Sequence, residues 1–343
     1  MSTHDASALR DTPTSECGNR RTIACGYVRE SRISTLCYAA LAFALAGLIG
    51  ELGCGKRPAG GISVDPAFRR VLPPDTRVLA GVDIEKLKKA PFYRAHESSL
   101  YFPLLDAWSE RTGLDLWRDV SDLVLAWNGT GPLFMMRGQL RPAVVERKIV
   151  PLSAAPRSYK RYRVFGENEN SIVFLKKGLA VAGPIGAVHA AIDRETEGDN
   201  QIPEELERGL TTLPQASQIW AVSRGGLPVA DLPMRSEYSS ALSNFVGYVQ
   251  DTAIAATIDK DVHVFANLTC VSAAGAQRVY VGLRATKAFA RLTAKQDQQD
   301  LVRLYDAVRI DKDGDVVRVH ADFSADLADK LLEYLPRVSR RTS

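Results

Sequence analysis

Residues 72–83 read LPPDTRVLAGVD, and a looser form of the same pattern, LPQASQIWAVS, occupies residues 213–223. In each stretch a leucine and a proline precede a short run rich in apolar residues, which predicts a β-strand entered through a turn. In the first stretch, Asp83 then stands where it can cap a helix that starts at Ile84. We therefore expect two similar structural units, each opened by one of these stretches.

The segment after the first stretch predicts a hairpin, short strands and a helix. DLVLAWNGTGPLFMMRG, at residues 122–138, has apolar runs on either side of Asn128 and Gly129, a pair that adopts the positive φ angles of tight hairpin turns. Gly183 and Pro184 should end the sheet and open a helix. Three short strands are expected before them, at 162–165, 172–175 and 179–182.

The segment after the second stretch repeats this plan. Apolar residues from Tyr238 to Val249 recur at helical spacing, and the residues from Gly282 to Tyr305 are mostly helix formers. Within the latter, Leu301, Leu304 and Tyr305 form an apolar stripe. Two hairpins and a last helix are also expected, at 256–268, 308–323 and 325–335.

Strands and helices alternate here without the regularity of repeated βαβ units, which favours an α+β fold class. We expect two similar modules, each a mostly antiparallel sheet with packed helices. The predicted organisation is a disordered leader extension at 1–30, a signal peptide or lipoprotein-like anchor at 31–54, a linker at 55–69, module 1 at 70–200 and module 2 at 201–338.

The composition excludes two classes of protein. With 343 residues, of which 45% are apolar, the chain can bury a full core and is not a disordered protein. Its 44 basic and 40 acidic residues leave a formal charge of only +4, far from the concentrated basic surface of a nucleic-acid-binding protein. Nucleic acid is therefore not an expected partner.

An apolar run near the N-terminus predicts export. Residues 36–50 read LCYAALAFALAGLIG, a length typical of a signal-peptide core and short for a membrane-spanning helix. Arg29 and Arg32 precede the run, and positive charge on that side directs the downstream chain across the membrane. We expect the body of the chain to fold on the extracytoplasmic side, in the cell envelope or periplasm.

Cys54 is the candidate lipidation site. It follows Leu52 and Gly53 and precedes GKRPAGG, and this arrangement resembles a bacterial lipoprotein processing site, in which the cysteine becomes an acylated N-terminus. Such sites usually have leucine three residues before the cysteine, whereas this chain has Glu51. The alternatives are an uncleaved anchor and an ordinary export signal.

No catalytic, cofactor-binding or metal-binding residue is predicted, although two motifs come close. Gly50, Gly55 and Lys56 have the spacing of a phosphate-binding loop, but Arg57 follows instead of serine or threonine. Asp311, Asp313 and Asp315 surround Gly314, but the glycine and the glutamate of a calcium-binding EF-hand loop are not at the required positions.

Other reactive or charged residues are interpreted as structural or solvated. Cys270 is the one cysteine of the body, and we expect a small buried side chain there. The histidines of the body have no shared metal-ligand spacing; they are His96, His189, His263 and His320. Two basic clusters could contact anionic head groups but are more simply solvated: Arg157, Lys160, Arg161 and Arg163, and Arg337, Arg340 and Arg341.

Three stretches together resemble a group of uncharacterised bacterial exported proteins. They are LPPDTRVLAGVDIEKLKKAPFY at 72–93, LAVAGPIGAVHAAID at 179–193 and DGDVVRVHADFSADLADKLL at 313–332. The resemblance covers most of residues 72–335 and implies export and an α+β fold. It implies no activity, cofactor or catalytic residue.

From the sequence we expect an exported envelope protein, tethered to a membrane, that binds or scaffolds another envelope component and is not an enzyme. One alternative is an extracytoplasmic, hydrolase-like enzyme whose site is assembled from dispersed residues. Another is a module that holds a lipid or another small apolar ligand. These classes differ in whether the body offers a surface, a polar cleft or an apolar cavity.

Overall fold

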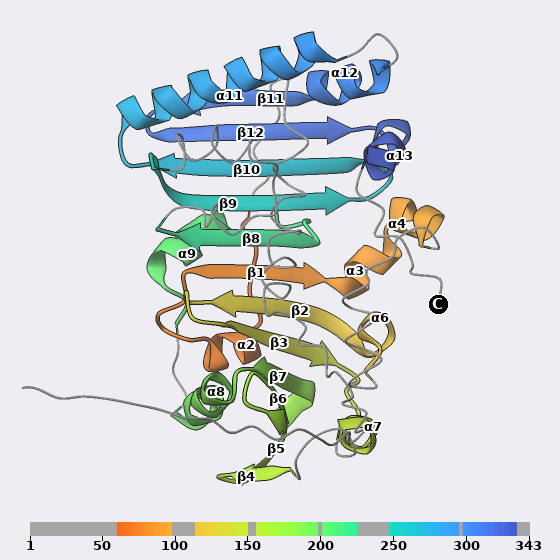
Figure 1. Ribbon diagram of the computed structural model, residues 1–343, viewed down its shortest axis with the longest axis vertical. Helices are drawn as coiled ribbons and strands as arrows, with labels where there is room; N and C mark the ends of the chain where they lie inside the picture. The colour runs from red at the N-terminus through yellow and green to blue at the C-terminus, as the bar shows by residue number, and fades with distance from the viewer. Residues whose placement is uncertain are drawn as a thin grey trace, which may run out of the picture.

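The structure, a computed structural model, describes residues 60–97, 114–149, 156–197, 201–225, 247–294 and 298–334. These residues form an α+β fold in which helices pack on both faces of one large antiparallel sheet (Figure 1). The α+β class and the antiparallel sheet are as predicted.

Twelve strands form the sheet in the order β11-β12-β10-β9-β8-β1-β2-β3-β7-β6-β5-β4. In chain order they are β1 (Val78–Asp83), β2 (Val120–Trp127), β3 (Pro132–Gly138), β4 (Arg157–Tyr159), β5 (Tyr162–Glu167), β6 (Asn170–Phe174), β7 (Leu179–Gly183), β8 (Ile219–Arg224), β9 (Val249–Ile258), β10 (Val262–Cys270), β11 (Val308–Asp313) and β12 (Val316–Phe323).

The helices are mostly short. They are α2 (Pro66–Val71), α3 (Ile84–Lys89), α4 (Pro91–His96), α6 (Leu116–Asp119), α7 (Pro142–Ile149), α8 (Ile185–Glu197), α9 (Glu204–Thr211), α11 (Ala273–Thr293), α12 (Gln299–Asp306) and α13 (Ala325–Tyr334), with a 3-10 turn at Lys176–Gly178. Asp83 caps α3 as predicted, because its carboxylate accepts a hydrogen bond from the Lys86 amide at 2.8 Å.

Pairing between β1 and β8 joins the two halves of the chain into this single sheet. The strands run antiparallel, with Leu79 opposite Val222 and Gly81 opposite Trp220. A side chain at Gly81 would start 2.3 Å from the Trp220 ring, so the indole occupies the space that the glycine leaves. The two predicted modules therefore share one sheet instead of each having its own.

The largest hydrophobic core also spans both halves. On one face of the sheet, Leu79 and Val124 of the first half pack with Val222 and Ala253 of the second. Helices α2, α8 and α9 cover this face, whereas α7 lies on the opposite face of the first half. On that opposite face, α11, α12 and α13 cover the second half.

Strand order repeats outward from the β1 and β8 pair. One side reads β1-β2-β3-β7-β6, and the other reads β8-β9-β10-β12-β11. In both halves, a hairpin pairs with the central strand through its first strand, β2 or β9. A later hairpin then adds to the sheet through its second strand, because β7 pairs with β3 and β12 pairs with β10. The predicted hairpins at 122–138, 256–268 and 308–323 are confirmed by the pairs β2 and β3, β9 and β10, and β11 and β12.

Three expectations from the sequence need correction. The predicted linker 55–69 ends in α2, whose Phe68 and Val71 are buried, because Pro66 favours the first turn of a helix. The predicted helix 282–305 is two helices: α11 begins earlier, at Ala273, where Ser272 caps it, and α12 is separate. Val249 begins strand β9 instead of ending a helix; the residues 226–246 before it lie outside the described part.

Replacing Gly81 with alanine should destabilise the fold, because the new methyl group would displace the Trp220 indole at the junction of the two halves. We expect a loss of about 1–3 kcal/mol, as for other overpacked interiors, measured by urea unfolding. Gly186→Ala is the matched control, because nothing lies within 4 Å of its added methyl group. A Gly81→Ala protein as stable as this control would contradict the proposed contact.

Candidate functional site

The predicted lipidation site, Cys54, lies outside the described residues, as do Gly50, Gly55 and Lys56 and the basic residues Arg337, Arg340 and Arg341. The remaining candidates from the sequence are in the body. Each has a defined place in the sheet or on a helix.

The carboxylates around Gly314 belong to the hairpin of β11 and β12, with Asp311 and Asp313 in strand β11 and Asp315 in the turn. Asp313 pairs with Arg318 at 3.0 Å across the hairpin between β11 and β12. Gly314 has a φ of 60°, which the turn requires. Within the described ranges, no group of three or more histidine, cysteine, aspartate or glutamate side chains could hold a metal ion.

The four histidines are dispersed over the fold, and each has a local contact. His96 lies 2.8 Å from Asp329 and so links α4 to α13, and His189 stacks on Tyr159. On the polar face of β10 and β12, His263 lies 2.7 Å from Asp322. The His320 ring packs edge-on against Phe265, and burial lowers its pKa.

Cys270 is buried at the end of β10, as expected for a small apolar side chain. Burial, reinforced by the nearby Asp315 carboxylate, raises the pKa of its thiol. Because the thiolate is the nucleophilic form, this cysteine is poorly suited to covalent chemistry.

Ion pairs neutralise most of the basic cluster at β4 and β5. Lys160 pairs with Asp193 at 2.6 Å, and Arg163 pairs with Glu146 at 2.6 Å. Arg161 lies 3.3 Å from Glu195. The cluster therefore presents much less net positive charge than its sequence indicates.

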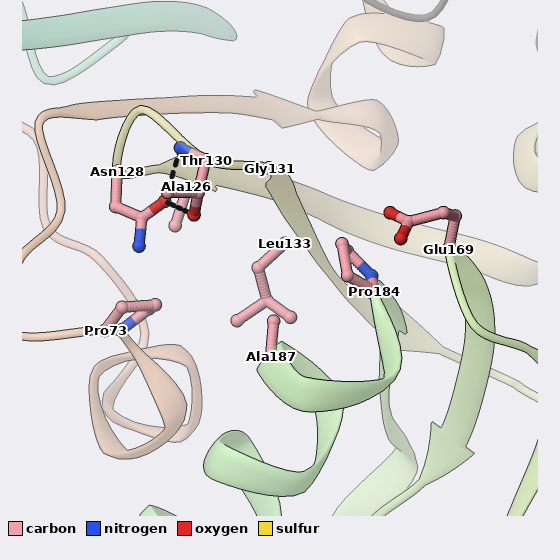
Figure 2. Close-up of a pocket in the computed structure, with 9 residues that line it drawn as sticks. All are labelled: Pro73, Ala126, Asn128, Thr130, Gly131, Leu133, Glu169, Pro184 and Ala187. Atoms are coloured by element: carbon pink, nitrogen blue, oxygen red, sulfur yellow. Dashed lines mark hydrogen bonds between the residues drawn. The ribbon is translucent and has the colours of Figure 1, made fainter. Parts of the chain in front are cut away.

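A small pocket opens beside the turn between β2 and β3, where the start of α8 approaches it (Figure 2). Its volume is about 240 Å³. Within the pocket, the Asn128 side chain donates to Asp75 and accepts hydrogen bonds from Thr130, so its amide is already used. The lining residues are Pro73, Ala126, Asn128, Thr130, Gly131, Leu133, Glu169, Pro184 and Ala187.

Glu169 is the single ionisable residue among those that line this pocket. A mechanism that uses one side chain as the acid and another as the base needs two titratable groups within reach of the reacting atoms. This pocket therefore offers a small recess with one carboxylate and no acid and base pair.

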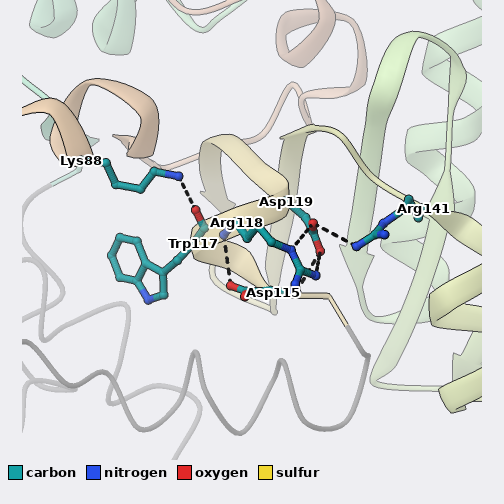
Figure 3. A network of polar contacts seen from close by, with 6 residues as sticks. All are labelled: Lys88, Asp115, Trp117, Arg118, Asp119 and Arg141. Carbon is teal, nitrogen blue, oxygen red and sulfur yellow. Dashed lines mark hydrogen bonds and ion pairs between the residues drawn. The ribbon is translucent and has the colours of Figure 1, made fainter. Parts of the chain in front are cut away.

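A polar network around Asp119 fixes α6 against the first hairpin (Figure 3). The Asp119 carboxylate is almost fully buried and accepts a hydrogen bond from Arg118 Nε at 3.0 Å. It also accepts one from the Asp115 amide, and Arg141 lies 3.4 Å away. The hydrogen bond from Arg118 is the main cause of the lowered pKa of Asp119.

Lys88 of α3 connects this network to a second helix, because its ammonium group donates to the Trp117 carbonyl of α6 at 2.5 Å. Arg141 thus connects α6 to the end of the hairpin and Lys88 connects α3 to α6, whereas Arg118 and Asp119 pair within α6. The arrangement is that of a structural network that positions α3 and α6.

Helix α11 has an apolar surface that no described residue covers. Val281, Phe289 and Leu292 are 52%, 69% and 83% exposed. The exposed residues Ala285 and Ala288 lie between them, so that neighbours along the helix surface are three or four residues apart. This spacing places all five side chains on one face of the helix. We call this face the α11 stripe: Val281, Ala285, Ala288, Phe289 and Leu292.

The α11 stripe lies on the outer side of the helix. Ala276 and Val279 face the core and are fully buried, and Leu283 packs beside them. Figure 1 shows α11 along one end of the sheet, next to β11 and α12. Among the described residues, every mostly exposed large apolar side chain lies on this helix or, as Val271 does, directly before it.

The sequence held a signal for this stripe that the prediction of a helix at 282–305 missed. Residues 273–293 contain no aspartate or glutamate, and the apolar residues have helical periodicity on two sides. An ordinary surface helix is apolar on one side only. On α11 the second apolar side is exposed to solvent.

No helix in the described ranges is long and apolar enough to cross a membrane.

No protein-family model matches the chain, and no curated protein matches it. The chain is similar to solved structures of TP0453. For crystal form I the TM-score is 0.44 at 11% identity, over 79% of this chain and 97% of the other. For crystal form III it is 0.47 at 13% identity, over 79% and 99%.

Replacing Asp119 with asparagine should destabilise the protein by about 1–2 kcal/mol at neutral pH, because the charged hydrogen bond from Arg118 is lost. The pKa of Asp119 is lowered in the folded state, so its contribution is complete above the unfolded pKa, near 4, and disappears as the pH falls through the folded pKa.

Urea unfolding of both proteins over a pH series checks this prediction. The difference in the free energy of unfolding should be largest near neutral pH and shrink under acidic conditions. A difference that does not depend on pH would show that the Asp119 charge is not responsible.

Proposed function

We propose that this chain is an exported envelope protein, tethered to a membrane by its N-terminal segment, that binds or scaffolds another envelope component and is not an enzyme. The observation that carries the proposal is the α11 stripe. It places three large apolar side chains in solvent on one face of a helix, and such surfaces mark interaction sites.

The distribution of the titratable groups supports a binding role. The most buried carboxylate network, at Asp119, connects α6 to the hairpin. The pocket near Asn128 has one ionisable lining residue, Glu169. The exposed apolar area lies at a distance from both, beside β11 at one end of the sheet (Figure 1).

We also propose that the two halves are copies of one ancestral module. Ala80 and Ala221 each lie eight residues after the leucine of their stretch, Leu72 and Leu213. These two alanines are directly opposite each other where β1 pairs with β8. Residues that are equivalent in sequence thus meet at the position expected of a local twofold axis.

The turns before the two strands support this duplication. The Thr76 amide donates to the Pro73 carbonyl, and the Ser217 amide donates to the Pro214 carbonyl in the same way. The strand orders β1-β2-β3-β7-β6 and β8-β9-β10-β12-β11 also correspond. The test is to align the first half of homologous chains with their second half. If this alignment pairs Ala80 with a residue other than Ala221, the duplication is contradicted.

The tether is tested by replacing Cys54 with serine. We expect a labelled fatty acid to enter the natural chain in growing cells and not the variant, because only a thiol forms the lipid thioether, and we expect the variant to remain unprocessed. Gel electrophoresis and fractionation measure both effects. Equal labelling of the two proteins, or a mature N-terminus other than Cys54, would contradict lipidation at this residue.

The binding surface is tested by a photoreactive amino acid at Leu292 of the full chain in intact cells. We expect covalent adducts at this position, because its side chain is 83% exposed at the end of the α11 stripe. The same amino acid at Thr286, which is exposed on α11 outside the stripe, is the control. If Leu292 gives no more adduct than Thr286, the stripe is not a binding surface.

A further inference from the structure

Two carboxylates, Asp83 and Asp122, face each other across β1 and β2. They are register partners in this antiparallel pair, and side chains at such positions have Cβ atoms about 5 Å apart, so that two like charges there repel each other. We propose that Asp122 is a proton-binding site, which takes up a proton as the surroundings become acidic and thereby tightens the contact between α3 and β2. This inference goes beyond the proposed function and does not depend on it.

The hydrogen bonds around Ser121 can be completed only with a proton on Asp122. The Ser121 hydroxyl lies 2.7 Å from Asp122 Oδ2 and 3.1 Å from the Arg137 carbonyl oxygen, but a hydroxyl group has one proton to donate. If Asp122 is ionised, that proton serves only one of the two acceptors. If Asp122 is protonated, its carboxyl group donates to the Ser121 oxygen while Ser121 donates to the carbonyl, and both contacts become hydrogen bonds.

A β-bulge places Ser121 in this bridging position. The pairing of β2 with β3 changes register between Val120 and Asp122, which are opposite Gly138 and Arg137. Ser121 is therefore the additional residue of the bulge, and bulges redirect side chains in this way. Here the redirected hydroxyl reaches a carboxylate of β2 and a backbone carbonyl of β3.

The charged groups that act on Asp122 come from each element packed against it. Asp83 of β1 and Glu85 of α3 add negative charge, and Lys86 of α3 adds positive charge. Lys86 already pairs with Asp83, at 2.8 Å. Arg137 is opposite Asp122 on β3, but its guanidinium group pairs with the carboxylate that caps α2. No basic group of these elements is therefore paired with Asp122.

Partial burial is the main cause that raises the pKa of Asp122, and repulsion by Asp83 adds to it; the hydrogen bond from Ser121 and the charge of Lys86 act in the opposite direction without cancelling this effect. The folded protein thus holds the proton more tightly than the unfolded chain, in which the pKa of aspartate is near 4. Protonation consequently stabilises the fold as the pH falls through the folded pKa, and the gain is complete below the unfolded pKa. This is the opposite sign to that of Asp119.

The location of Asp122 connects its protonation to both halves of the sheet. Ile84 of α3 and Val120 of β2 belong to the same core cluster, so repulsion between the two carboxylates acts where α3 packs on β2. One residue after α3, helix α4 begins, and its Phe92 lies in the apolar cluster of the second half. A tighter α3 therefore also stabilises the docking of α4 on the second half.

The test compares urea unfolding of the full chain with that of Asp122→Asn, from neutral pH down to about pH 4, near the pKa of an unfolded aspartate. Asparagine has nearly the same shape as aspartate, carries no charge and donates to the Ser121 oxygen at every pH. Glu169→Gln is the matched control for the change in net charge, because Glu169 is an exposed carboxylate in the turn between β5 and β6.

We expect Asp122→Asn to raise the folding equilibrium constant about two- to fivefold at neutral pH, as for the removal of like charges opposed on neighbouring strands. The difference from the natural chain should disappear toward pH 4, and Glu169→Gln should follow the natural chain throughout. In an Asp83→Asn background the gain should be smaller, because asparagine also caps a helix but does not repel Asp122.

An Asp122→Asn protein that is no more stable than the natural chain at neutral pH would overturn the inference, as would a gain of the same size at every pH. If this variant does not fold, Asp83→Asn alone decides. Lowering the pH should then favour the folded state less in Asp83→Asn than in the natural chain, and an equal effect on the two proteins would overturn the inference.

Discussion

Pairing between β1 and β8 is the constraint on which the rest of the structure depends. The first half of the chain supplies β1 and the second half supplies β8, and the Trp220 indole covers Gly81 where the two strands meet. Side chains next to this junction belong to the core cluster that spans both halves, which includes Leu79 and Val222. If the pairing were absent, two sheet edges and an apolar layer would be exposed to water, which proteins avoid.

The junction also determines where the charged and apolar surfaces lie. Because the sheet is continuous, the cluster at β4 and β5 and the helix α11 are held at opposite ends of the strand order (Figure 1). At β4 and β5, carboxylates pair with most of the basic groups. At α11, basic groups lie next to exposed apolar side chains on a helix without acidic residues. The two ends therefore present different surfaces, one of paired charges and one with exposed apolar side chains.

Local features were predictable from the sequence, because single residues determine them. The cap at Asp83 forms as expected, and the hairpin turns where Asn128 and Gly129 predicted a turn, although Gly129 alone of that pair has a positive φ, at 105°. The class of fold followed from the alternation of strands and helices.

Features that depend on distant parts of the chain were missed. Periodicity shows that a segment is a strand but does not say which strand it pairs with, so the union of β1 with β8 was not predicted. Helix α2 begins inside the predicted linker, at Pro66, and was missed because Phe68 and Val71 are buried only by packing on the core. The α11 stripe was missed because Leu301, Leu304 and Tyr305 mark the inward side of α12 and not the outward side of α11.

Native-state hydrogen exchange on the full chain tests the central claim, that the two halves form one sheet with one core. Strands β2 and β9 lie on either side of the central pair, and both contribute to the shared core. If the halves are one cooperative unit, the slowest amides of β2 and β9 should open with the same free energy and the same dependence on urea. Two separate opening free energies, divided between β1 and β8, would show that the halves are independent modules and would contradict the account.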